Sequence, residues 1–253
     1  MGGVGKSQLA IEYAYRITDE LPGMWAFWVY ASNANQFAEG FREIAERVKL
    51  AGRKDPNTKI YESVYNWLCQ SKVPWLLIID NIDDANSLFD PDAAVTGQAD
   101  GPPKPLKGYL PVCRRGSILF TSRNHDAVSE LVEQSNIINV NLWTRQRRPH
   151  YFKKNFGTGT SEDLLRQIAS KLECMPLALS QAAAFIRRRG SQCSVERYLD
   201  MFDKNEEDML RLLRYDKRQL RRHPEAANSI IVTWQITFKH IREKRRTATD
   251  LLW

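Results

Sequence analysis

The chain has 253 residues and a formal net charge of +7 at pH 7, with 43% hydrophobic and 26% charged residues, which is ordinary for a soluble globular protein. No stretch approaches the roughly 18 uninterrupted apolar residues of a membrane span, and the N-terminus does not read as a cleavable signal peptide. The four cysteines lie far apart without CxxC spacing, so we expect reduced thiols and a cytoplasmic protein that does not enter the membrane.

The charge is unevenly distributed along the chain. Residues 1–141 carry 14 basic and 17 acidic side chains, whereas residues 142–253 carry 23 and 13. This asymmetry is compatible with a nucleic-acid-binding surface. Clusters such as Arg187–Arg189 and Lys244–Arg246 more often only keep helix faces in solvent, so we favour that interpretation of the charge.

The first 141 residues show strand and helix patterns in alternation. The apolar spacing predicts helices, and the apolar and β-branched runs predict strands. A long surface loop rich in Gly, Pro and Asp is expected over 90–111. The order along the chain is helix 7–17, strand 25–31, helices 37–48 and 61–70, strand 75–80, strand 117–121, a short helix 126–132 and strand 137–140. The alternation predicts an α/β fold with a doubly wound parallel sheet.

After residue 141 the strand signal stops and helical patterns follow. The sequence from Thr160 to Asp163 is typical of a helix N-terminus, and Pro176 opens a further helix that is almost wholly apolar. Helices are also predicted at 194–202 and around 230–241. We therefore divide the chain into an α/β domain (1–141), a helical domain (142–224) and the start of a third domain (225–253).

The opening segment resembles a loop that holds phosphate groups. Such a loop needs glycines that turn backbone N–H groups toward the anion, a lysine for the β and γ phosphates, and a hydroxyl for Mg²⁺. The residues Gly2, Gly3, Gly5, Lys6 and Ser7 meet these needs and lead directly into a helix. The first glycine of the full pattern would stand just before Met1. The alternative is a glycine-rich terminus next to an unrelated helix.

Two later strands end in polar residues that fit the same chemistry. Asp80 ends an apolar strand, as a Mg²⁺-coordinating carboxylate does in P-loop enzymes, although an Asp there can also cap a turn. Asn81 follows it, where efficient ATPases place a second acid that activates water. Arg123 follows the strand 117–121, at the edge where ligands of open α/β sheets bind, and could contact the γ phosphate or make a surface salt bridge.

These segments together resemble the NB-ARC module of the STAND class of P-loop NTPases. The resemblance rests on Gly2–Ser7, Leu76–Asp84, Gly116–Arg123 and Cys174–Leu179, in this order and spacing. The stretch 228–253 is similar to the start of the winged-helix domain in fungal NOD-like receptors, proteins of innate immunity. The resemblance covers nearly the whole chain.

The resemblance implies roles for individual residues. Lys6 would bind the β and γ phosphates, Ser7 and Asp80 would hold Mg²⁺, Arg123 would read the γ phosphate, and Pro176 would pack against adenine. The expected nucleotide contacts are Gly2, Gly3, Val4, Gly5, Lys6, Ser7, Gln8 and Pro176, and the residues expected to act on the phosphates are Lys6, Asp80 and Arg123. Family members exchange ADP for ATP to oligomerise and hydrolyse ATP slowly, so this chain would be at most a slow ATPase.

Three features depart from the family pattern. The strand that precedes the phosphate loop is missing, helix patterning fails over 143–156, and the chain stops before the histidine motif that senses ADP. Cys174 also stands where the family motif has glycine. We therefore expect a chain truncated at both ends, without its effector and repeat domains. The alternatives are a nucleic-acid-binding protein with an ATPase module, which is less favoured because Trp234 and Phe238 lie on an apolar stripe, and an inactive fragment.

Overall fold

The computed structural model describes residues 2–55, 59–83, 105–141, 152, 155–156 and 159–204. Contacts divide the chain into two compact units. Lys6–Ile138 is the first, which we call the sheet unit, and Met1–Gly5 with Asn139–Trp253 is the second, which we call the helical unit. The expected third domain at 225–253 lies outside the described residues.

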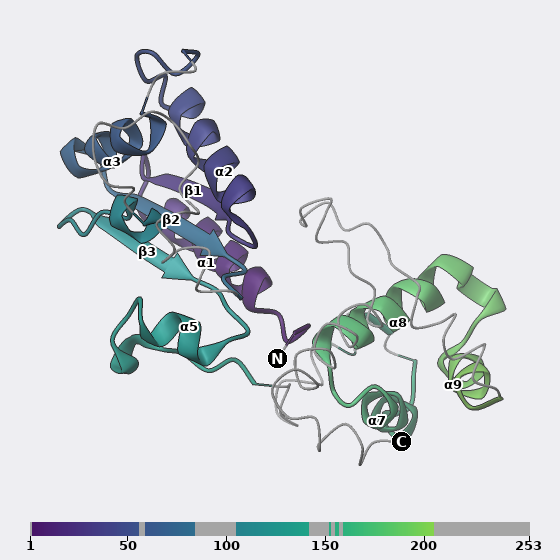
Figure 1. Ribbon diagram of the computed structural model, residues 1–253. Coiled ribbons are helices and arrows are strands. Elements are labelled where there is room, and N and C mark those ends of the chain that lie inside the picture. The colour runs from purple at the N-terminus through teal and green to yellow at the C-terminus, as the bar shows by residue number, and fades with distance from the viewer. Residues whose placement is uncertain are drawn as a thin grey trace. The chain divides into compact units, whose positions relative to one another are not determined.

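The sheet unit contains three parallel strands in the order β1-β2-β3 (Figure 1). The strands are β1 (Trp25–Tyr30), β2 (Trp75–Asp80) and β3 (Gly116–Phe120). The middle strand β2 is buried along its whole length, as its uninterrupted apolar sequence predicts. The predicted α/β class with a parallel sheet is therefore confirmed.

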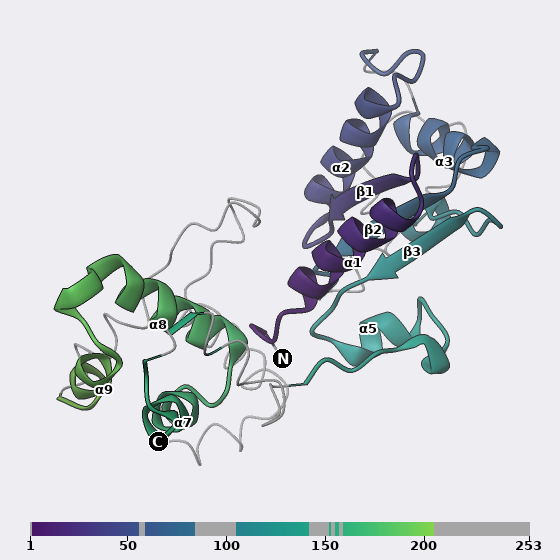
Figure 2. The same cartoon turned by 180° about the vertical axis from the view of Figure 1, so that it is seen from behind.

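Helices cover both faces of this sheet, as the views from the two sides show (Figures 1 and 2). Helix α1 (Lys6–Glu20) packs Ala10 on one face against Leu76 and Ile78. Helices α2 (Ala34–Arg47) and α3 (Ile60–Gln70) cover the other face. The amide of Gln36 caps α2 by donating to the Asn33 side chain at 3.0 Å. The alternation of layers is what the sequence pattern predicts.

Helix α1 buries a narrower stripe than its sequence predicts. Ala10, Ala14 and Ile17 pack on the sheet as expected, whereas Leu9 and Tyr13 remain 51% and 48% exposed. The described sheet has only three strands, so it covers one part of the predicted stripe. The other part faces away from the described core.

Two predictions between residues 105 and 140 are wrong. The segment 137–140 is not a strand, and Ile138 is 85% exposed, because no described strand lies beside it to supply hydrogen bonds. The described end of the predicted surface loop contains a short 3₁₀ helix, η2 (Leu106–Tyr109), whose Leu106 is fully buried in the core of the sheet unit. The composition rich in Gly and Pro predicted a surface loop, but the apolar side chain of Leu106 anchors this part of the chain in the core.

Short helices complete the sheet unit. Helix α5 (His125–Ser129) is capped by Asn124, whose side chain accepts from the backbone N–H of Asp126 at 3.1 Å. It is shorter than the predicted 126–132 because the chain turns at Glu130 and Leu131. A single 3₁₀ turn, η3 (Gln134–Asn136), follows.

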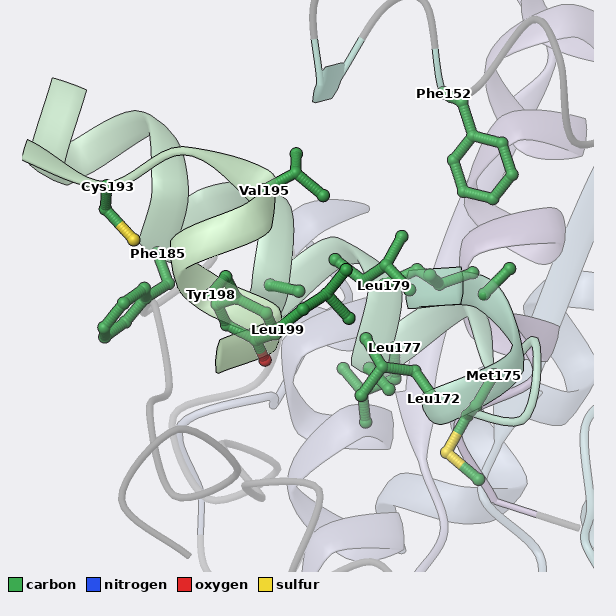
Figure 3. Close-up of a cluster of buried hydrophobic side chains, with 14 residues drawn as sticks. Phe152, Leu172, Met175, Leu177, Leu179, Phe185, Cys193, Val195, Tyr198 and Leu199 are labelled. Atoms are coloured by element: carbon green, nitrogen blue, oxygen red, sulfur yellow. The ribbon is translucent and has the colours of Figure 1, made fainter. Parts of the chain in front are cut away.

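The described part of the helical unit contains three longer helices around one apolar core (Figure 3). They are α7 (Glu162–Lys171), α8 (Pro176–Arg189) and α9 (Val195–Lys204), and the 3₁₀ turn η4 (Gly190–Gln192) joins the last two. Helix α7 begins within the predicted segment 160–163, and Ser161 caps it by accepting from the backbone N–H of Leu164 at 3.4 Å. In the ranges that the structure describes, no helix combines the length and the apolar character that crossing a bilayer requires.

Candidate functional site

Polar side chains gather where β2 and β3 end. Asp80 is 5% exposed and Thr121 is 7% exposed, although the rest of the core of the sheet unit is apolar. Because the strands are parallel, their carboxyl ends lie at the same edge of the sheet, where ligands of open α/β sheets bind. This edge is therefore the candidate site.

The carboxylate of Asp80 joins the end of β2 to the start of α1. The Ser7 hydroxyl donates a hydrogen bond to Asp80 Oδ1 at 2.7 Å, and the Thr121 hydroxyl donates to the same oxygen. Burial raises the pKa of the Asp80 carboxyl above its ordinary value, and these two hydrogen bonds act in the opposite direction. The site therefore holds a costly buried acid between two hydroxyl groups.

Asn81 turns the chain directly after this carboxylate. Its φ angle is +66°, in the left-handed region that asparagine tolerates better than most residues. Its backbone N–H donates to the Thr121 hydroxyl oxygen at 3.0 Å. The Ser122 hydroxyl donates to the carbonyl of Ile82, so the two segments that follow β2 and β3 are bound together.

Arg123 lies in this paired segment and is partly buried. Its Nε is 3.0 Å from Asp83 Oδ2, its backbone N–H donates to Asp83 Oδ1 at 2.8 Å, and its Nη2 is 3.4 Å from Asn81 Oδ1. Its Nη1 is buried and has no hydrogen-bond partner among the described residues. A buried donor without a partner costs roughly 1–3 kcal/mol, which an anionic ligand would offset.

The charged groups at the same edge of the sheet also affect the pKa of Lys6. Burial lowers the pKa of its ammonium group, and the attraction of Asp83 and Asp80 does not compensate for this burial. The positive charge of Arg123 lowers the pKa further. The carboxyl end of the sheet therefore holds two positive and two negative groups close enough for the other three to affect Lys6: Lys6, Arg123, Asp80 and Asp83.

The glycine segment that precedes Lys6 adopts backbone angles that need glycine. Gly3 and Gly5 have φ angles of +76° and +100°. Within the helical unit, the backbone N–H of Leu177 donates to the carbonyl of Gly3 at 3.1 Å, and a Cβ added to Gly3 would lie 3.2 Å from Met175 Sδ. Both glycines are therefore conformational requirements of this segment.

Pro176 and its neighbours form the start of α8. Pro176 is buried at the first turn of the helix, where proline lacks no hydrogen bond. Cys174, which precedes this proline by two residues, has a φ angle of +56°. The backbone thus keeps a left-handed conformation at this position without glycine, at a cost of about 1–2 kcal/mol.

The structure brings some predicted residues together and adds others. Lys6, Ser7, Asp80 and Arg123 all lie at the site edge of the sheet unit, and Gln8 follows them in the first turn of α1. The remaining predicted residues belong to the helical unit and are Gly2, Gly3, Val4, Gly5 and Pro176.

Sequence analysis missed two functional candidates. In the sequence, Thr121 is only the last residue of the predicted strand 117–121, and Asp83 is not singled out, yet they contact Asp80 and Arg123. The available signal was their position at the ends of parallel strands that both finish at the site. Trp234 and Phe238, which bear on the nucleic-acid-binding alternative, lie outside the described residues.

The oxygen ligands at this site suit a hard cation that keeps most of its water. In the part of the chain that the structure describes, no group of three or more His, Cys, Asp or Glu side chains could hold a metal ion. Mg²⁺ bound with a nucleotide needs only one or two protein oxygens besides phosphate and water. The adjacent hydroxyl of Ser7 and carboxylate of Asp80 fit that need.

No family model matches the chain. It is 32% identical over 260 aligned residues to a nucleotide-binding leucine-rich repeat (NLR)-like protein of Hyaloscypha variabilis, and the match covers 100% of this chain. The chain spans about a quarter of that relative's length, 26%. The Aeropyrum pernix ORC1 protein, solved in complex with DNA, matches at a TM-score of 0.44 and 14% identity over 83% of this chain and 56% of that chain.

Proposed function

We propose that this chain is the nucleotide-binding module of an NLR-like signalling protein of the P-loop NTPase class and binds ATP or ADP with Mg²⁺. The observation that carries the proposal is the hydrogen bond from Ser7, the residue after Lys6, to the buried Asp80 at the end of β2. A lysine, a hydroxyl and a strand-end carboxylate in this arrangement match what phosphate and Mg²⁺ binding requires. The similarity to an NLR-like protein supports the same class.

The residues of the sheet unit fit a nucleotide with its metal ion. Lys6 would contact the β and γ phosphates. The negative charge of a phosphate would favour the charged ammonium group and so offset the effect of burial on its pKa. Ser7 and Asp80 would hold Mg²⁺, which supplies charge neutralisation of the phosphates when bound. Nη1 of Arg123, which has no hydrogen-bond partner in the part of the chain that the structure describes, would provide a donor for the terminal phosphate.

The glycine segment and α8 supply the remaining expected contacts. The positive φ angles of Gly3 and Gly5 suit a loop that turns its N–H groups toward phosphate, with Gly2, Val4 and Gln8 as neighbours. Pro176 would pack against the adenine ring. Its position next to Leu177, which bonds the Gly3 backbone, supports this assignment within the helical unit.

We infer an NB-ARC type of switch rather than a fast enzyme. Exchange of ADP for ATP would favour association of several copies, and hydrolysis would return the protein to its resting state. Asn81 occupies the place of a water-activating acid and its side chain instead accepts from Arg123, so turnover should be slow. The upstream effector and downstream repeat domains of the family belong to this proposal as partners.

Mass spectrometry of nucleotide released from the purified full-length protein tests the proposal. We expect ADP or ATP in a near-stoichiometric amount. Titration calorimetry of nucleotide-free protein with Mg-ADP and Mg-ATP checks the same point independently. The absence of both a released nucleotide and any binding heat would refute nucleotide binding.

A further inference from the structure

Asp83 holds Arg123 by two different groups. Asp83 Oδ2 pairs with the guanidinium Nε at 3.0 Å, while Oδ1 accepts from the backbone N–H of the same arginine at 2.8 Å. Both side chains are partly shielded, with exposed fractions of 24% for Arg123 and 32% for Asp83. One carboxylate thus fixes both ends of the arginine, its main chain and its charged head.

Among the described residues, the contact leaves one edge of the guanidinium without a carboxylate partner. Asp83 occupies Nε, so the edge formed by Nη1 and Nη2 points away from this carboxylate. Nη2 makes only a long contact of 3.4 Å to Asn81 Oδ1, and Nη1 is buried without a hydrogen-bond partner among the described residues. The two η nitrogens form an edge with which arginine can bind two phosphate oxygens at once.

The arginine edge and Lys6 act on the same volume. Asp83, Arg123 and Asp80 are the charged groups that affect the pKa of Lys6. A phosphate group bound by Lys6 would therefore lie within electrostatic reach of Arg123. Because Asp83 holds both the main chain and Nε of Arg123, it determines whether the η nitrogens point toward that phosphate group.

We propose that Asp83 is a positioning residue that presents the η nitrogens of Arg123 to the terminal phosphate and so makes the site prefer a nucleoside triphosphate over a diphosphate. This inference rests on the proposed nucleotide binding. In the bound state a phosphate oxygen replaces Asn81 Oδ1 at Nη2 and gives Nη1 its partner. The opposite role, in which Asp83 withholds Arg123 from phosphate, fits the geometry less well. Asp83 contacts Nε and the main chain, and Nη1 has no partner within the described ranges.

The substitution Asp83→Asn separates the two contacts of this carboxylate. Asparagine keeps an oxygen for the backbone N–H of Arg123 and has the same size, but it loses the charge that pairs with Nε. Groups that orient a metal ligand change affinity by about 10- to 100-fold, and by analogy we expect about a tenfold loss of affinity for a non-hydrolysable ATP analogue. Affinity for Mg-ADP should stay within about twofold of the parent, since ADP lacks the phosphate that Arg123 contacts.

The experiment is titration of the full-length protein with Mg-ADP and with the analogue, in parent, Asp83→Asn, Arg123→Ala and the double variant. If Asp83 acts through Arg123, Asp83→Asn has no further effect in the Arg123→Ala background. The control Asp19→Asn removes the same charge from the exposed end of α1 and should change neither affinity. Thermal melts confirm that each variant is folded.

The outcomes distinguish this inference from the proposed function. Equal losses for both nucleotides, no loss, or tighter binding of the analogue by Asp83→Asn would overturn the positioning role while nucleotide binding stands. Additive losses in the double variant would overturn it as well. A parent that binds neither nucleotide would overturn both proposals.

Discussion

The two ends of strand β2 are built from opposite kinds of residue. At the amino end, Trp75 is fully buried, its indole N–H donates to the carbonyl of Leu68 at 2.9 Å, and a Cβ added to Gly116 would lie 2.0 Å from its ring. At the carboxyl end, Asp80 is also buried but interacts with hydroxyl groups and lies near charges. The difference indicates that the amino end supplies stability, whereas in our proposal the carboxyl end supplies the ligand site.

The carboxyl end is costly for the protein without a ligand. Burial disfavours the charged forms of both Asp80 and Lys6, and Arg123 Nη1 has no partner among the described residues. A ligand that satisfies these groups would stabilise the fold by about 2.7 kcal/mol at a concentration of 100 times its dissociation constant. The amino end has no such dependence, because its partners are part of the chain.

The largest effect is expected from Trp75→Ala at the amino end. Removing this fully buried ring leaves a cavity, so the free energy of unfolding should fall by about 3–5 kcal/mol. Urea denaturation of the full-length protein measures this loss. The control Ile138→Ala, at an 85% exposed side chain, should change stability by no more than about 0.5 kcal/mol. A comparable loss in both variants would contradict the assignment of stability to the amino end.

The next effect concerns ligand binding at the carboxyl end. Lys6→Ala removes a desolvated cation that faces phosphate in our proposal, a loss of roughly 2–5 kcal/mol by analogy with buried charge pairs. The affinity for Mg-ATP and Mg-ADP should therefore fall at least about thirtyfold. Titration calorimetry checks this, with Lys72→Ala, an exposed lysine just before β2, as the control. Equal dissociation constants for Lys6→Ala and the parent would remove Lys6 from the site.

Much of this comparison could be predicted from the sequence. The apolar run that ends in Asp80 predicted a buried strand with a site at its end, and Gly-Lys-Ser before a helix predicted the neighbours of that site. Both signals are local and lie in continuous stretches of chain. The parallel sheet followed from the alternation of strands and helices.

Contacts between distant segments could not be predicted in the same way. The Asp83–Arg123 pair joins residues forty positions apart, and its existence depends on the register of β2 and β3. The burial of Leu106 and the absence of a strand at 137–140 depend on which neighbours are available. The sequence also did not show that Cys174 has a left-handed backbone. A residue other than glycine can adopt it, because the cost of a positive φ angle is small enough for packing to offset.

A smaller effect is expected for catalysis. Asn81→Asp places an acid after Asp80 that can activate water, and aspartate tolerates the positive φ angle at this position. Steady-state phosphate release should rise by about tenfold, well below the range of 10²–10⁴-fold typical of an optimised base. The parent should turn over far below the enzyme median of about 10 s⁻¹. Ordinary enzymatic rates in the parent would mean that another group, such as Asp83, activates water.

The smallest effect is expected at Asp80, where one substitution should raise stability and weaken function. Burial raises the folded-state pKa of its carboxyl above the ordinary value of 3.8. Between these two pKa values the folded protein binds more protons than the unfolded chain, so this group lowers stability as the pH rises from 3.8 through the folded pKa. Above the folded pKa the penalty is fully present. Asp80→Asn removes the charge but retains a group that can bond the hydroxyls of Ser7 and Thr121.

We therefore expect Asp80→Asn to raise the unfolding free energy of the nucleotide-free protein at pH 7 by about 1 kcal/mol, as in other trade-offs between stability and activity. The gain should shrink as the pH falls toward 3.8, because the parent carboxyl is then protonated as well. The same variant should lose the Mg²⁺ dependence of nucleotide affinity, since a neutral amide is a poor ligand for this ion. Urea denaturation at several pH values, with Asp19→Asn as the control, measures the first effect. A less stable variant at pH 7 would mean that the hydrogen bonds to the carboxylate outweigh its burial, and that the carboxyl end, like the amino end, stabilises the fold without a ligand.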